Sequence, residues 1–276
     1  MERHEDRRSF MALRELFAFA GLCLALASPA PAQASGPDEA AAPDTARHAA
    51  WSALLKEYVA PGPDGVNRFD YAALKADSED RAALERYIAG YESLDFDKLG
   101  RDAAFAAWAN LYNAVTVRHI LERYPLGSIR DGYLFGGPWK DVTVIADGEE
   151  ISLDAIEHDV LRVKWDDPRV HYAVNCASIG CPDLLNRAWT GETLDTDLDA
   201  AARAYVNHPR GVTVRENGTL KVSRIYKWFR EDFGGSDDGV IAHLRQYADA
   251  DLRPALAGDV RIRGHQYDWS LNDVEG

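Results

Sequence analysis

The sequence predicts an α+β domain in which helices come early in the chain and β-hairpins come later. Apolar residues recur at helical spacing over 46–58, 79–91 and 102–124. Two turn dipeptides, Asp147-Gly148 and Asn217-Gly218, each join two short segments and predict two hairpins. Strands and helices do not alternate regularly, which argues against a parallel sheet. We therefore expect a single domain over 46–276, with a buried central helix packed on an antiparallel sheet.

The segment 102–124 is the predicted central helix, and it is apolar on almost every side. A helix of this kind is normally buried in the middle of a domain. Asn110 and Asn113 lie three residues apart on one face of it, and buried amides need hydrogen-bond partners. They either tie the helix to a neighbouring backbone or point into a site, so Asn113 is a candidate site residue. His119 is interpreted as a hydrogen-bonded histidine of the core.

The remaining elements follow in order along the chain. A hairpin is expected at 142–151, and Ser152 can cap a helix that runs to about Val163. Residues 170–175 are interpreted as a buried strand, and Pro182 suits the first turn of a short helix. The domain is then completed by a second hairpin at 212–222, a helix after Ser223, a helix near 239–247 and a closing strand from Val260.

Two cysteines, Cys176 and Cys181, mark the candidate site. The predicted strand delivers Cys176 to a tight turn, and Cys181 is placed at the N-cap of the predicted short helix. Free backbone N–H groups and the helix dipole lower the pKa of a thiol at such a position. His171 lies upstream, and Glu157 and His158 lie on the preceding helix. These are the residue types from which a thiol nucleophile, its base and an orienting group are drawn.

Three interpretations of this cluster stay open. Two cysteines five positions apart can form a disulfide in an oxidising compartment, and closing so small a loop stabilises a fold by only about 2 kcal/mol. A catalytic thiol is the second interpretation. A metal site formed by Cys176, Cys181, His171 and His158 is the third, although their spacing matches no standard zinc pattern.

The N-terminal residues predict a cleavable signal peptide over 1–34. A basic segment precedes an apolar run at 17–27, which is shorter than the roughly 20 residues of a membrane-spanning helix. Residues 32–34, Ala-Gln-Ala, fit a cleavage site, and 35–45 is interpreted as a disordered lead-in. Residues 7–11 also resemble a twin-arginine motif, which would carry a folded protein. The expected location is periplasmic or secreted.

The charge balance argues against several classes of partner. The chain has 45 acidic and 31 basic residues, a net charge of −14. Such a chain has no general attraction to phosphate backbones or anionic lipids. We therefore expect no nucleic-acid partner, no membrane span and no cofactor, and a small molecule or peptide as the ligand.

Four segments resemble the motifs of one known family. They lie at 107–114, 152–162, 167–182 and 225–233. In this order they resemble domain-of-unknown-function family 547, over most of the chain from about Val66. The resemblance assigns no roles, but it implies that motif positions are occupied by Asn110, Asn113, Glu157, His158, Arg169, His171, Cys176 and Cys181.

The same elements are loosely similar to the papain and transglutaminase group. In that group the nucleophile opens the central helix, whereas here the helix carries Asn110 and Asn113. The expected function is a thiol-dependent hydrolase or acyl transferase of papain-like type. Cys176 would be the nucleophile, His171 or His158 the base and Glu157 the orienting group, with an oxyanion site near Cys181. The alternatives are a non-catalytic periplasmic binding module with a Cys176–Cys181 disulfide, and a metal-binding protein.

Overall fold

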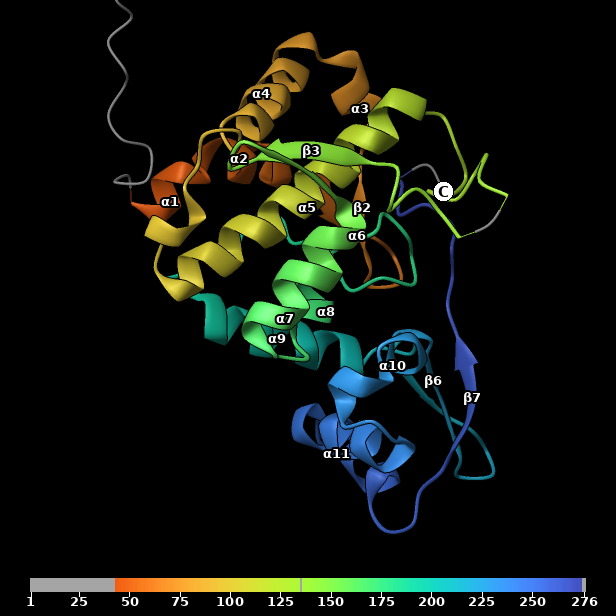
Figure 1. Ribbon diagram of the computed structural model, residues 1–276. Coiled ribbons are helices and arrows are strands. Elements are labelled where there is room, and N and C mark those ends of the chain that lie inside the picture. Colours follow the sequence, from red (N-terminus) through yellow and green to blue (C-terminus); the bar gives the residue numbers. More distant parts are fainter. Residues whose placement is uncertain (1–42, 135, 275–276) are drawn as a thin grey trace, which may run out of the picture. The chain divides into compact units, whose positions relative to one another are not determined.

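The computed structural model describes residues 43–134 and 136–274 (Figure 1). The predicted signal peptide and most of the predicted lead-in lie outside the described residues. The first described helix begins at Asp44, two residues before the predicted start of the domain. The helices of the first half are α1 (Asp44–Arg47), α2 (Ala49–Tyr58), α3 (Tyr71–Ala76), α4 (Ser78–Ala89), a 3-10 turn (Phe96–Lys98) and α5 (Arg101–Arg123).

Helix α5 is the buried central helix that the sequence predicts. Every residue from Ala104 to Val117 is buried, and α3, α4 and the helical segment that follows residue 152 pack against it. His119 is a buried core residue as expected, but its buried Nε2 has no hydrogen-bond partner among the described residues, so the predicted hydrogen bond is not found there. Its pKa is lowered to about 4 by burial and by Arg123 and Arg118. None of the helices in the described part of the chain has the length and apolar character that a bilayer span requires.

The strands within the described residues form three small sheets, and the α+β class is confirmed. Both predicted hairpins are present, and Asp147 and Gly148 take positive φ angles of 51° and 75° as a two-residue hairpin turn requires. The strands pair as β1 (Val59–Pro61) with β2 (Asn67–Phe69), β3 (Thr143–Ala146) with β4 (Glu149–Ser152), and β5 (Val212–Val214) with β6 (Leu220–Ser223) and β7 (Ile262–Gln266).

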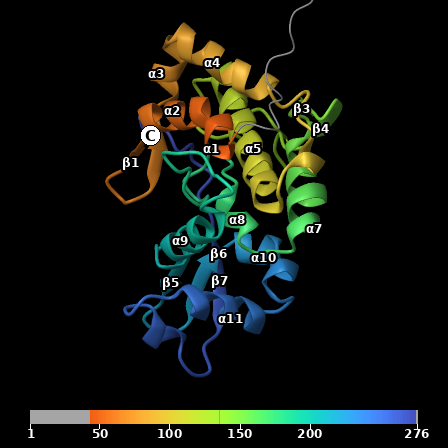
Figure 2. The ribbon, with the colours of Figure 1, turned by 90° about the vertical axis from the view of Figure 1, so that its left-hand side faces the viewer.

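Two features of the sheets differ from the expected single antiparallel sheet. Strand β7 pairs in parallel with β6, because the chain crosses back through a helix between them rather than through a tight turn. The central helix α5 is surrounded mainly by helices, and the hairpin of β3 and β4 lies to one side of it (Figures 1 and 2).

The second half of the chain continues in short helices. Ser152 caps the first of them as predicted, its Oγ accepting from the Ala155 N–H at 3.1 Å. This helix is not regular, because its middle turns are π-helical, a feature common at functional sites. The helices are α6 (Leu153–Ala155), the π-segment (Ile156–Leu161), α7 (Arg162–Trp165), α9 (Leu194–Val206), α10 (Ile225–Trp228), α11 (Asp237–Tyr247) and two 3-10 turns (Arg230–Phe233 and Arg253–Leu256).

Two predictions near the cysteines are wrong. Residues 170–175 are not a strand: helix α8 (Val170–Ala173) occupies most of them and only the backbone at Val174 is extended. A short apolar run fits either a strand or a buried helix, so its periodicity could not decide. Pro182 does not begin a helix either, since residues 182–190 are irregular.

Candidate functional site

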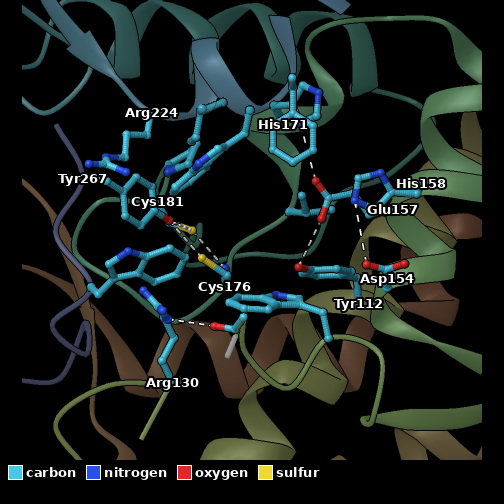
Figure 3. A pocket seen from close by; sticks show the side chains of 18 residues that line it. Tyr112, Arg130, Asp154, Glu157, His158, His171, Cys176, Cys181, Arg224 and Tyr267 are labelled. Atoms are coloured by element: carbon cyan, nitrogen blue, oxygen red, sulfur yellow. Dashed lines mark hydrogen bonds and ion pairs between the residues drawn. The ribbon is translucent and has the colours of Figure 1, made fainter. Parts of the chain in front are cut away.

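The predicted thiols and the predicted histidines line one pocket of about 510 Å³ (Figure 3). The thiols lie at one end of it, and Glu157, His158 and Asp154 lie at the other. Six aromatic side chains also line the pocket, namely Tyr112, Trp139, Trp228, Phe229, Tyr267 and Trp269. The volume and the mixed lining are those of a small-molecule site.

The backbone before Cys176 is held by the central helix. Asn113 donates from Nδ2 to the Ala173 carbonyl at 2.9 Å and accepts from the Asn175 N–H at 2.7 Å. Asn110 makes the same two-way contact with the backbone of Trp189, at 2.8 and 3.0 Å. Both amides therefore tie the helix to neighbouring backbone. Asn113 does not line the pocket, so it can act on the site only by positioning the chain before Cys176.

Asn175 holds the turn that follows. Its Nδ2 donates to the Pro182 carbonyl at 2.7 Å, and its Oδ1 accepts from the Ala177 N–H at 2.8 Å. Ala177 has a φ of 56°, which is strained for a residue with a Cβ. This turn folds the chain back so that Cys181 returns to Cys176.

Cys176 and Cys181 are both free thiols in the structure, in contact with each other. The Cys176 N–H donates to Cys181 Sγ at 3.1 Å. The Tyr267 hydroxyl lies 3.0 Å from Cys176 Sγ and 3.1 Å from Cys181 Sγ, and Ser178 Oγ lies 3.3 Å from Cys176 Sγ. Cys181 is 4 % exposed, whereas Cys176 is more accessible.

The two thiols titrate as a pair, and Cys181 is the one that ionises first. Burial alone would raise the pKa of Cys181, but hydrogen bonds from Cys176 and Tyr267 lower it to about 7. The hydrogen bond with Cys181 and burial together raise the pKa of Cys176. Of the two thiols, Cys181 is therefore the one whose thiolate the surroundings favour.

The predicted cause of this shift is wrong, although its direction is right. Cys181 is not at a helix N-cap, because no helix follows it at 182–190. Side chains that are distant in sequence and one backbone N–H supply the hydrogen bonds instead.

Neither predicted histidine base reaches the thiols by a hydrogen bond. His171 Nε2 pairs with Asp232 Oδ2 at 2.6 Å, and its Nδ1 faces Glu157 Oε1 at 3.6 Å. His158 Nδ1 accepts a hydrogen bond from Arg162 Nη1 at 2.6 Å. Glu157 is near both histidines in the pocket, but it orients neither of them toward Cys176.

Asp232 joins the two histidines. It accepts a hydrogen bond from His171 Nε2 and two more from Arg162, from Nε at 2.6 Å and from Nη2 at 2.8 Å. Burial would raise the pKa of Asp232, but these hydrogen bonds hold it well below the usual range of a carboxyl. These contacts form one fixed charged network at the end of the pocket away from the thiols, made up of His171, Asp232, Arg162 and His158.

The backbone around the thiols offers little to a developing oxyanion. The Cys176 N–H is used by Cys181, and the Cys181 N–H donates to the Ser178 carbonyl at 3.0 Å. The N–H groups of Ile179 and Gly180 donate to the carbonyls of residues 270 and 268. The oxyanion site expected near Cys181 is therefore not formed from these groups.

The structure does not assemble the metal site considered from the sequence. Among the described residues, no group of three or more His, Cys, Asp and Glu side chains is placed to hold an ion. Cys176 and Cys181 lie together, but His171 and His158 are held at the opposite end of the pocket by Asp232 and Arg162.

Several polar residues in or beside the pocket were not identified as site residues from the sequence, among them Asp232, which contacts the pocket residue His171. Asp232 lies inside the fourth motif, which was the one available signal for it. Tyr267 lies 91 residues from Cys176 and follows β7, so no local pattern links the two. Arg130 and Arg224 sit in a loop and before a short helix, where charged residues are ordinary.

Replacing Tyr267 by phenylalanine is expected to raise the pKa of Cys181 by about one pH unit, because a donor to its thiolate is lost. The fraction of thiolate at pH 7 should then fall. Absorbance of the thiolate near 240 nm, followed against pH, measures this. Ser178→Ala is the matched control, since Ser178 contacts the Cys176 sulfur, and it should change the pKa less. A larger effect of Ser178→Ala would place the thiolate on Cys176 instead.

Comparison with known proteins gives a family but no activity. Residues 96–206 match the model of a family described as protein of unknown function, DUF547. This confirms the resemblance of the motifs that lie within that range. No curated protein matches the chain, and no solved structure matches it.

Proposed function

We propose that this chain, which belongs to domain-of-unknown-function family 547, is an exported enzyme of thiol–disulfide exchange. One observation carries the proposal. Two free thiols, Cys176 and Cys181, lie together on the wall of a ligand-sized pocket, where the Tyr267 hydroxyl contacts both sulfurs and hydrogen bonds lower the pKa of Cys181. A thiolate near neutral pH and a second thiol within reach are what disulfide exchange requires.

The reaction follows from the contact between the sulfurs. A proton moves from Cys176 Sγ to the Cys181 thiolate, which leaves the more accessible sulfur as the nucleophile. Cys176 Sγ attacks one sulfur of a substrate disulfide, the substrate S–S bond breaks, and the first thiolate leaves and takes up a proton from water. Cys181 then loses its proton and attacks Cys176 Sγ, which releases the second thiol. The substrate disulfide gains two electrons, and the protein becomes the Cys176–Cys181 disulfide. A second turnover requires an external dithiol reductant, which gives two electrons and two protons to that disulfide and is itself oxidised to a disulfide.

Disulfide exchange accounts for the site better than the acyl transfer expected from the sequence. Acyl transfer needs a base in contact with the nucleophile and donors for an oxyanion. Here the histidines are engaged with Asp232 and Arg162, and the N–H groups of the turn are engaged with backbone and sulfur. Exchange needs neither group, because the second sulfur accepts the proton and also resolves the intermediate.

A thiol hydrolase is the second candidate, and one observation favours it. Glu157, His158 and His171 line the same pocket as Cys176, so a bound substrate could bridge the two ends. In that case an activated ester should leave an acyl group on Cys176. Export is proposed with either candidate: the signal-peptide pattern of residues 1–34 supports it, and an oxidising compartment supplies disulfides.

The proposed reaction has a direct test. The reduced protein, mixed with 2-hydroxyethyl disulfide at pH 7.5, is expected to release two thiols per chain while its own mass falls by two hydrogens. Peptide mapping should place the new bond between Cys176 and Cys181. No thiol release, with both cysteines unchanged in mass, would exclude the exchange reaction. The non-catalytic binding module would be favoured by a different result: a stable Cys176–Cys181 disulfide that a reductant opens and that 2-hydroxyethyl disulfide does not form again.

A further inference from the structure

The pocket has opposite charges at its two ends. Arg130 and Arg224 flank the thiol end, whereas Asp154 and Glu157 lie at the other end (Figure 3). The guanidinium of Arg224 has no hydrogen bond or ion pair among the described residues, so the fold does not use its charge. Arg130 donates from Nε to the Gly136 carbonyl at 2.8 Å and lies over the Trp269 ring, and its other N–H groups remain available.

At the acidic end, the carboxyl groups of Glu157 and Asp154 have few close hydrogen-bond donors. Glu157 is 8 % exposed, and its closest polar neighbours are the Tyr112 hydroxyl at 3.4 Å and His171 Nδ1 at 3.6 Å. Both contacts are long for a buried carboxylate, which normally has close donors. Asp154 is 4.0 Å from His158 Nε2. Arg162 makes no hydrogen bond to Glu157, because its Nε and Nη2 pair with Asp232 and its Nη1 with His158.

We propose that the substrate is a small zwitterionic disulfide, of the amino-acid or short-peptide class. Its carboxylate would pair with Arg224 and Arg130, its ammonium group with Glu157 and Asp154, and its sulfur would meet Cys176 between them. Arginine binds carboxylates through paired N–H groups, and an ammonium group supplies the donors that Glu157 lacks. The inference rests on the proposed exchange reaction for its chemistry, but the two charged ends exist independently of it.

Four disulfides of similar length show separately what the ammonium group and the carboxylate of the substrate contribute. Cystine carries both groups, cystamine only the amines, 3,3′-dithiodipropionate only the carboxylates, and 2-hydroxyethyl disulfide neither. We expect kcat/KM to be highest for cystine. Arg224→Gln should lower the preference for cystine over cystamine about tenfold, the effect of one charge-assisted hydrogen bond. Glu157→Gln should lower the preference for cystine over dithiodipropionate by a similar factor. Arg261→Gln, a change at an exposed arginine paired with Asp259, is the matched control and should alter neither ratio.

A binding measurement separates this inference from the reaction. Cystathionine replaces one sulfur of cystine by CH2 and cannot exchange. It should bind the Cys176→Ser protein in calorimetry, and Arg224→Gln added to that variant should weaken binding about tenfold. Equal rates for all four disulfides, or cystathionine binding unaffected by both Arg224→Gln and Glu157→Gln, would overturn the zwitterion inference and leave exchange standing. Tight cystathionine binding without any exchange would overturn the reaction and leave the ligand class standing.

Discussion

Replacing Cys176 by serine is expected to lower kcat/KM for disulfide reduction by about 1,000-fold or more, the scale of losing a nucleophile. A serine hydroxyl is not ionised near neutral pH, and Cys181 cannot substitute because it is 4 % exposed. The loss should appear with the neutral 2-hydroxyethyl disulfide as well as with cystine. Thiol release followed by a colorimetric thiol reagent measures it.

The Cys181→Ser protein is the matched control for this change. It keeps the accessible sulfur but loses the thiol that resolves the intermediate, so it should react once and then stop. A single reaction by Cys176→Ser, together with no reaction at all by Cys181→Ser, would reverse the two roles.

Replacing Asn113 by alanine is expected to lower the free energy of unfolding by about 2–4 kcal/mol, because buried backbone groups lose their partners. The Asn175 N–H loses its acceptor, whereas the Ala173 carbonyl keeps the Trp189 Nε1–H at 3.2 Å. Asn110→Ala should cost a similar amount, since the N–H and carbonyl of Trp189 both lose a partner. Urea denaturation of each variant measures the change.

The pair of variants also separates stability from positioning. Asn113 holds the backbone that leads into Cys176, whereas Asn110 holds the backbone at Trp189. Asn113→Ala should therefore change the pH dependence of thiol alkylation, and Asn110→Ala should leave it as in the unmodified protein. Equal effects of the two variants on alkylation would show that Asn113 contributes only to stability.

The sequence predicts those parts of the fold whose signals are local or strongly periodic. The apolar character of 102–124 gives the buried helix α5, and Asp147-Gly148 gives the first hairpin turn. Residues 170–175 were misread because four or five apolar residues carry no usable period. The parallel pairing of β6 with β7 joins residues 42 or 43 positions apart, which no turn dipeptide can indicate.

For the site, too, the sequence predicts the residues that carry local signals and does not predict their distant partners. One pocket is lined by the five residues that residue type and motif position suggest, namely Cys176, Cys181, His171, His158 and Glu157. Their partners could not be assigned, because Tyr267 and Asp232 reach them from 61 to 91 residues away. As a result, the thiol pKa shift was predicted in the right direction from a helix terminus that does not exist.

The central claim is that Cys176 is the nucleophile of a thiol pair that exchanges disulfides. Mass spectrometry of the Cys181→Ser protein after reaction with cystine tests it most directly. The claim predicts one half-cystine bound to the chain through Cys176, released quantitatively by a reductant. The claim is contradicted if Cys176 of the Cys181→Ser protein carries no half-cystine under conditions in which the protein without substitutions consumes cystine.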